Sequence, residues 1–217
     1  MKKDMYLLVS VVLNIVLLGY LFFTRPSSGT PPNTVSERTQ TTDKILFIGN
    51  SIIARCNWNE LLENPNIVNE GVGGITSGEI FMRMDEFLVG NPKKIFFEMG
   101  SNDIRTNARL QEIINAFHNC LHTIRIKNPF TKVYFFSVLP VVEHPNADGI
   151  RLNDKIDQLN SNIEIFCKRY KAEYVEINSI LKDNSGGLAP PYSLDGTHLT
   201  PAGYEAIKSK ISNCLKD

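Results

Sequence analysis

The chain has 217 residues, of which 42% are hydrophobic and 21% charged, an ordinary composition for a globular protein. Lys and Arg together number 23, as do Asp and Glu, so no net charge draws the chain toward a polyanion. This balance argues against nucleic acid as a partner. With a hydrophobic N-terminal stretch set aside, about 175 residues remain, enough for one domain with a real core.

The first predicted element is a transmembrane helix over residues 5–23, a stretch without a charged side chain. As a helix it would be about 28 Å long, close to the hydrocarbon thickness of a bilayer. Lys2 and Lys3 precede it, which favours a cytoplasmic N-terminus over residues 1–4 and export of the rest. We expect an uncleaved signal anchor, with a cleaved signal peptide and secretion as the alternative. Either way, the globular domain is expected on the periplasmic or extracellular side.

Residues 24–43 are rich in Pro, Ser and Thr and show no apolar periodicity, so they predict a flexible linker. The globular domain is then expected over residues 44–217. Short and mostly unbroken apolar runs in this domain predict strands that are covered on both faces. The runs are Ile45–Ile48, Ile67–Val68, Ile95–Met99, Val133–Val138 and Tyr174–Ile177.

Helical periodicity alternates with these strands. Apolar side chains recur at three- and four-residue steps over residues 110–124 and 152–166. Thr200 and Pro201 are expected to open a last helix, as its N-cap and first-turn proline. The alternation predicts an α/β fold, a three-layer αβα sandwich around a central, mainly parallel five-stranded sheet.

The 4 cysteines are far apart and show no metal-binding spacing. Cys120, Cys167 and Cys214 fall on the apolar faces of predicted helices, which favours a role as small core residues, and the same role is expected for Cys56. An exported domain could also form a disulfide, but the sequence does not indicate a pairing.

Polar, glycine-containing stretches follow the predicted strands. Ligands of a parallel sheet bind where the carboxyl ends of its strands meet, so these stretches are expected to share one edge. They are "GNS" (49–51), "NEGVGGITSG" (69–78), "GSNDI" (100–104) and, before the last helix, "SLDGTHLT" (193–200).

Ser51 and His198 are the candidates for nucleophile and base. A serine hydroxyl is a poor nucleophile without a positioned base, and Asp195, three residues before His198, can fold back to orient the imidazole. The alternative is that Ser51 caps the following helix and that Asp195 only forms a turn.

Acyl transfer also needs donors for the oxyanion. The glycines of residues 69–78 expose backbone N–H groups, and Asn102 carries a side-chain amide at the end of the third strand. Each also fits a simpler interpretation, as a tight turn or a helix cap.

The remaining histidines are weaker candidates. His118 and His122 have the spacing of two metal ligands, but Asn119 stands where a metalloprotease carries Glu, and no third ligand suggests itself. His144 lies in a polar loop. We therefore expect no metal and no organic cofactor. The loops over residues 139–149 and 183–194 are expected to shape the substrate pocket.

The ordered set of four stretches resembles the SGNH hydrolases, also called the GDSL esterase/lipase family, from about residue 44 to residue 215. "GVGGITSG", "MGSND", "SVLPVVEHPN" and "LDGTHLTPAGYEAI" are similar to the branch that contains the platelet-activating-factor acetylhydrolase Ib subunits and bacterial carbohydrate esterases. The resemblance implies the flavodoxin-like, SGNH form of the sandwich.

Carried over by position, the resemblance implies Ser51 as nucleophile, His198 as general base and acid, and Asp195 as the residue that orients His198. It implies an oxyanion hole formed by the Ser51 backbone N–H, the Gly74 backbone N–H and the Asn102 side chain. The substrate would be a short acyl ester, with O-acetyl groups on carbohydrate expected. Alternatives are a lysophospholipase or thioesterase acting on lipid, and a carbohydrate-binding or O-acetyltransferase domain without hydrolysis. Oligomeric state is not indicated.

Two positions depart from the family pattern. Gly74 matches the last glycine of its block, but the Asp-Thr pair that follows in the family is Ile75-Thr76 here. Asn50 replaces the Asp of Gly-Asp-Ser, which removes a negative charge beside the serine and keeps one acceptor oxygen. We expect activity to survive with a changed pH profile or substrate preference.

Overall fold

The structure is a computed structural model and describes residues 42–142 and 151–216. The predicted cytoplasmic residues 1–4, the predicted transmembrane segment 5–23 and residues 24–41 of the predicted linker lie outside that part. Within it, no helix combines the length and apolarity needed to cross a bilayer.

The centre of the domain is a parallel sheet of five strands in the order β2-β1-β3-β4-β5. All four strand pairings are parallel, as predicted from the strand and helix alternation. Each strand lies on an apolar run identified in the sequence, with ends that differ by a few residues. The strands are β1 (Thr42–Gly49), β2 (Ile67–Gly71), β3 (Pro92–Glu98), β4 (Lys132–Phe136) and β5 (Glu173–Val175).

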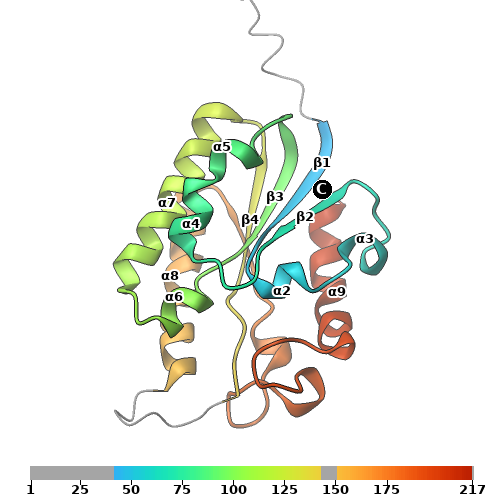
Figure 1. Cartoon of the computed structure of the whole chain (residues 1–217), viewed down its shortest axis with the longest axis vertical. Coiled ribbons are helices and arrows are strands. Elements are labelled where there is room, and N and C mark those ends of the chain that lie inside the picture. The colour runs from blue at the N-terminus through green and yellow to red at the C-terminus, as the bar shows by residue number, and fades with distance from the viewer. Residues whose placement is uncertain (1–41, 143–150, 217) are drawn as a thin grey trace, which may run out of the picture. The chain divides into compact units, whose positions relative to one another are not determined.

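Helices cover both faces of the sheet and give the predicted three layers (Figure 1). One face carries α4 (Ser77–Met82), α5 (Met84–Phe87), α6 (Ser101–Arg105), α7 (Leu110–Lys127) and α8 (Leu152–Tyr170); the other carries α2 (Ser51–Ala54), α3 (Trp58–Leu61) and α9 (Pro201–Leu215). Two 3₁₀ turns, η2 (Ser179–Leu181) and η3 (Pro190–Tyr192), lie between β5 and α9. Thr200 caps α9 by accepting a hydrogen bond from Gly203 N–H, and Pro201 follows it, as predicted.

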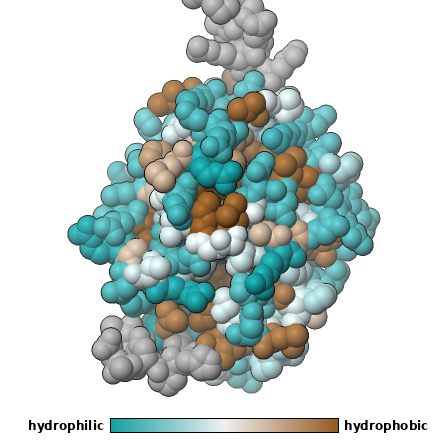
Figure 2. Space-filling model, viewed as in Figure 1, coloured by the Kyte–Doolittle hydropathy of each residue, from teal (hydrophilic) through white to brown (hydrophobic). Residues whose placement is uncertain are grey.

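The apolar runs are unbroken in the sequence because alternate residues of a strand enter different cores. In β1, Leu46 and Ile48 pack with α7 and α8, whereas Ile45 and Phe47 pack with α2 and α9. Two buried clusters result, one on each face of the sheet. On the face shown in Figure 2, hydrophilic side chains predominate and the hydrophobic ones form small separate patches.

Cys56, Cys120 and Cys167 are buried in these clusters, as expected for small core residues, and form no disulfide. Burial raises the pKa of each of these thiols to about 12, so they stay protonated and unreactive at neutral pH. Cys214 is half-buried beside α9's apolar face.

Candidate active site

Ser51, His198 and Asp195 form a connected row at the carboxyl edge of the sheet. Ser51 Oγ lies 2.9 Å from His198 Nε2, and His198 Nδ1 lies 2.6 Å from Asp195 Oδ2. An ionised carboxylate only accepts hydrogen bonds, so Nδ1 donates to it and Nε2 is left to accept the Ser51 O–H. The arrangement allows the hydroxyl to lose its proton as it attacks a carbonyl carbon.

The turn that carries His198 also fixes the Asp195 carboxylate. Asp195 Oδ1 accepts hydrogen bonds from the backbone N–H of His198 at 2.7 Å and of Thr197 at 2.9 Å. The bonds from the His198 backbone and ring, followed by that from Thr197, hold the pKa of Asp195 well below its usual range. Arg55 lies 4.0 Å from the carboxylate, but both side chains are about half exposed, so this ion pair is weak. The carboxylate therefore stays charged and can stabilise an imidazolium.

Asn50, and not Ser51, caps the helix after β1. Its Oδ1 accepts a hydrogen bond from Ile52 N–H at 2.8 Å, and its Nδ2 donates to Ser101 Oγ at 2.8 Å. The interpretation of Ser51 as the cap is wrong, because Ser51 is the first helical residue and its hydroxyl faces His198. Asn50 thus ties the Ser51 turn to the loop after β3.

Glycines allow the Ser51 turn to sit directly against its neighbours. A methyl group on Gly49 would overlap the backbone oxygen of Glu98 in β3 and come within 2.6 Å of Ile53. A methyl group on Gly71, at the end of β2, would overlap the backbone nitrogen of Ala54 in α2. Both positions need glycine because backbone lies where a side chain would be.

The loop after β3 brings Asn102 to the same edge. Gly100 precedes α6 with φ +116°, a backbone conformation that favours glycine. The Asn102 side-chain amide donates to Ile75 O at 2.9 Å, which leaves its second N–H for another acceptor. Asp103 is buried and accepts bonds from the N–H and hydroxyl of Ser77, the closer oxygens lying at 3.0 and 2.7 Å. These bonds join the segment after β2 to the segment after β3, and sequence reasoning missed them.

Gly74 lies in the turn that Asn102 contacts, beside Ile75, with φ +83°. It lines a shallow hollow with Val72, Ile75 and Met82, next to the pocket that holds Ser51. The structure thus brings Ser51, His198 and Asp195 into direct contact, places Asn102 in the same pocket as Ser51, and places Gly74 at the neighbouring hollow.

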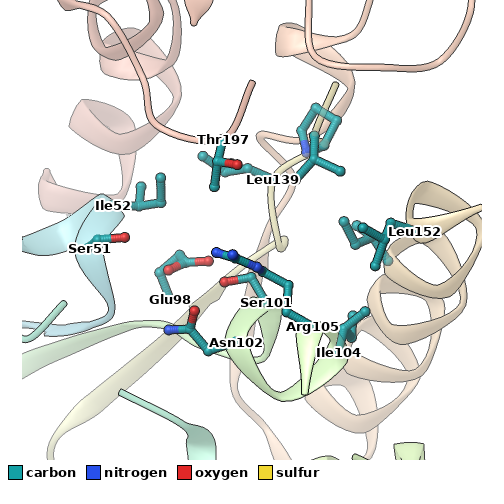
Figure 3. Close-up of a pocket in the computed structure, with 13 residues that line it drawn as sticks. Ser51, Ile52, Glu98, Ser101, Asn102, Ile104, Arg105, Leu139, Leu152 and Thr197 are labelled. Carbon is teal, nitrogen blue, oxygen red and sulfur yellow. The ribbon is translucent and has the colours of Figure 1, made fainter. Parts of the chain in front are cut away.

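A small pocket opens beside Ser51, and Figure 3 shows Ser51, Glu98 and Asn102 directed into it. Its cavity volume is about 30 Å³, enough for two or three heavy atoms. Residues 139–141 line it, as expected of that loop, and residues 143–150, including His144, lie outside the described part. No residue of 183–194, the other loop expected to shape the pocket, is among its lining residues. The lining residues are Ser51, Ile52, Glu98, Ser101, Asn102, Ile104, Arg105, Leu139, Pro140, Val141, Leu152, Ile156 and Thr197.

Glu98 is the residue of this pocket that sequence reasoning missed. Its side chain is fully buried at the end of β3, and neither carboxyl oxygen has a hydrogen-bond partner among the described residues. Burial raises the pKa of Glu98 to about 8, while the nearby Asn50 amide lowers it and the charge of Asp103 raises it to smaller extents. A charged residue closing the apolar run "KKIFFEMG" was the available signal.

The other residues weighed in the sequence lie away from this pocket. The rings of His118 and His122 stack with centroids 6.1 Å apart, and His118 packs edge-on against Tyr170. Trp58 is a core residue, and its Nε1–H donates to Ile53 O at 2.9 Å.

Comparison with known proteins gives the chain's relatives by sequence. Residues 47–206 match the GDSL-like Lipase/Acylhydrolase family. The platelet-activating factor acetylhydrolase IB subunit alpha2 of Rattus norvegicus is 25% identical over 170 residues, 75% of this chain and 72% of the relative. The N-acylneuraminate cytidylyltransferase of Escherichia coli O18:K1:H7 is 26% identical over 191 residues, 85% of this chain but only 44% of the relative. The chain thus spans less than half the length of that enzyme.

Solved structures share the fold. A protein of Streptococcus pneumonia named for platelet activating factor superposes with TM-score 0.74 and 32% identity, covering 84% of this chain and 87% of that one. The acetylxylan esterase Axe2 of Geobacillus stearothermophilus superposes with TM-score 0.66 and 15% identity, covering 82% and 96%, which shows the fold alone. By the match over residues 47–206, the chain belongs to the GDSL-like lipase/acylhydrolase family, the SGNH hydrolases.

Proposed function

We propose that the chain hydrolyses short acyl esters, O-acetyl groups on carbohydrate, through an acyl-enzyme on Ser51. The contact of 2.9 Å between Ser51 Oγ and His198 Nε2 carries the proposal, because it joins the nucleophile to a base already oriented by Asp195.

The reaction has two steps. Ser51 Oγ attacks the ester carbonyl carbon while its proton moves to His198 Nε2, and the tetrahedral intermediate collapses as that proton passes to the departing alcohol. Water then attacks the acyl-enzyme and gives a proton to His198, which returns it to Ser51 Oγ as the acid leaves. Asp195 stays ionised and stabilises the imidazolium in both steps.

The oxyanion of each intermediate needs hydrogen-bond donors. We assign this role to the backbone N–H groups of Ser51 and Gly74 and to the Asn102 side chain, whose second N–H is not used by Ile75. Asn102→Ala is expected to lower kcat about 10²- to 10³-fold with a small change in KM. A variant with unchanged kcat would remove Asn102 from the oxyanion hole.

The acyl group is proposed to be short because the pocket beside Ser51 is small and lined by Ile52, Leu139 and Ile156. The name of the rat relative, an acetylhydrolase, supports an acetyl group. The sugar is supported by the name of the Escherichia coli relative, which refers to an N-acylneuraminate, an acylated sugar acid. A lipid alcohol is the second candidate, since platelet-activating factor, named in the rat relative, is a lipid.

The first experiment separates these candidates and tests the nucleophile. Acetate release from acetylated glycans and from acetylated phospholipid is measured beside p-nitrophenyl acetate and p-nitrophenyl octanoate. We expect acetyl to exceed octanoyl hydrolysis, glycan to exceed lipid, and Ser51→Ala to abolish all of it and the labelling by a fluorophosphonate probe. Ser161→Ala, which removes an exposed hydroxyl on α8, is the matched control and should keep the label. Faster octanoyl hydrolysis would refute the short-acyl proposal.

The location is proposed from the sequence alone. Residues 5–23 would anchor the chain, with residues 1–4 in the cytoplasm, a linker after the anchor and the esterase domain on the outer side. Membrane fractionation of cells that express the full chain, with protease added to intact spheroplasts, tests this. A domain protected from the protease until the cells are lysed would refute it.

A further inference from the structure

Glu98 places an unusual group in the wall of the pocket beside Ser51. Its side chain has 0% exposure, and neither carboxyl oxygen accepts a hydrogen bond of full geometry among the described residues, although the side-chain and backbone N–H groups of Asn50 lie close enough to lower its pKa in part. Buried carboxyl groups are normally paired or hydrogen-bonded, because an unpaired charge is costly to remove from water. Burial without an ion pair therefore favours the protonated carboxyl, and the nearest open space for it is the pocket itself.

The surroundings of Glu98 contain little that would neutralise a negative charge. The Ser51 turn contributes the neutral Asn50 amide, and α6 contributes the carboxylate of Asp103, which opposes ionisation. The Arg105 guanidinium also lines the pocket, but it is exposed and forms no ion pair with any described acid. The loop before α9 contributes Thr197 to the pocket wall, and the next residue, His198, contacts Ser51.

Tyr204, which interacts with the charge of Glu98, and Cys56, which interacts with Tyr204, both titrate in a higher range. Burial raises the pKa of Cys56 to about 12. It also raises the pKa of Tyr204 above its usual range, to which the charge of Glu98 adds. Neither group changes charge near pH 8, so a change in activity there cannot be assigned to them.

The presence of Asn50, where the family pattern has Asp, fits a buried Glu98. The family pattern has Asp at this position, and an aspartate there would put a second carboxyl group against Glu98 in a buried site. Asn50 instead caps α2 through Oδ1 and donates to Ser101 through Nδ2, so the turn keeps its bonds and adds no acid beside Glu98.

We propose that Glu98 is a positioning residue of the esterase site that works as a neutral acid, and that its ionisation switches the site off. The proposal rests on the proposed function. Ionised Glu98 would place a full negative charge in the same buried pocket as Ser51 and Asn102, where the negative charge of the tetrahedral intermediate develops. It would also attract the Asn50 Nδ2 donor, whose bond to Ser101 Oγ ties the Ser51 turn to the loop after β3.

The test is the alkaline side of the pH profile. For the full chain in mild detergent, kcat/KM for p-nitrophenyl acetate is measured from pH 6 to 9.5, with Ser51→Ala as the blank for spontaneous hydrolysis. If only the form with protonated Glu98 is active, a pKa of about 8 predicts a loss of about thirtyfold between pH 7 and 9.5. Circular dichroism at pH 9.5 separates this loss from unfolding.

Two variants are expected to change the alkaline limb, the fall in kcat/KM at high pH, in different ways. For each variant we compare the ratio of kcat/KM at pH 7 to kcat/KM at pH 9.5. Glu98→Gln cannot ionise, so its ratio should fall below about three. Asn50→Asp adds a second carboxylate beside Glu98, so the limb should move to higher pH and the ratio should shrink without vanishing. Glu164→Gln, which removes a partly exposed acid on α8 outside the pocket, is the matched control and should keep the wild-type ratio.

The outcomes separate the two proposals. A Glu98→Gln enzyme that keeps the wild-type ratio overturns the role of Glu98 and leaves the serine esterase intact. If Glu98→Gln does not fold, the direction of the Asn50→Asp shift decides, and an unmoved or acid-shifted limb overturns the proposal. Activity that survives Ser51→Ala overturns the proposed function instead.

Discussion

Two carboxyl groups flank Ser51, and their surroundings drive them to opposite charge states. Asp195 lies on a turn with a side chain 51% exposed, and hydrogen bonds from His198 and Thr197 hold its pKa well below the usual range. Glu98 lies at the end of β3 with no exposure, and burial raises its pKa to about 8. At neutral pH one is a carboxylate and the other an acid. The difference teaches that solvent and N–H donors, and not residue type, assign charge within one site.

The largest expected effect comes from removing the charge on the exposed side. Asp195→Asn should lower kcat/KM about 10³- to 10⁴-fold, because the amide favours the wrong imidazole tautomer and cannot stabilise the imidazolium. The measurement is kcat/KM for p-nitrophenyl acetate at pH 7.

Asp183→Asn is the matched control for that change. Asp183 is also a turn aspartate whose pKa is lowered by hydrogen bonds, in its case from Ser185, and it does not line the pocket. Its substitution should leave kcat/KM within about twofold. Equal losses in both variants would mean that a turn carboxylate is needed for folding and not for catalysis.

Removing the acid on the buried side should change stability in a pH-dependent way. The folded chain holds the Glu98 proton up to about pH 8, whereas the unfolded chain releases it near the ordinary value of about 4.3, so raising the pH between these values favours unfolding. Glu98→Gln removes that dependence. Relative to the wild type, its free energy of unfolding should rise by roughly 3.5 kcal/mol between pH 5 and pH 8. Urea unfolding followed by circular dichroism at both pH values measures this.

Glu112→Gln provides the contrast for that experiment. Glu112 is exposed and its pKa is lowered by Arg109, so it is ionised in both the folded and unfolded chain over this range. Its stability difference from wild type should be the same at pH 5 and pH 8. A Glu98→Gln difference that is equally flat would show that Glu98 is not protonated in the folded chain.

The smallest expected effect concerns Arg55, the cation nearest to Asp195. The pKa of Asp195 is lowered chiefly by hydrogen bonds, and the ion pair with Arg55 is long and solvated. Arg55→Ala should therefore change kcat/KM by less than about threefold and leave the pH profile in place. A larger drop would show that charge, and not the turn, keeps Asp195 ionised.

The fold could be predicted in its main parts because its elements leave strong periodic signals. The five strands and the long helices α7, α8 and α9 were all expected from apolar runs and three- to four-residue steps. The short helices were not predicted as elements. Helices α2 and α3 have 4 residues each, too few for a periodic pattern, and they form because the chain must turn at the sheet edge.

The site was predictable only in the residues that follow the strands. Ser51, Asn102, Asp195 and His198 were all singled out because topology puts them at one edge. Their contacts depend on tertiary structure, which the sequence pattern does not give. Asn50 and Ser51 are adjacent, and only the coordinates show that Asn50 caps α2. Glu98 was missed because it is the last residue of a strand, and a charged residue there looks like the polar end of an apolar run. Only the coordinates show that it is buried in the pocket that holds Ser51.

Gly49 and Gly71 restrict how an enzyme with this site can change its substrate during evolution. Each lies where a single added methyl group would overlap the backbone of a neighbouring element, so the turn under Ser51 is packed backbone against backbone. Evolution of a new substrate range cannot proceed by shifting this turn. A new substrate range is then expected to come from the side chains and loops around the turn, such as residues 139–141, which line the pocket.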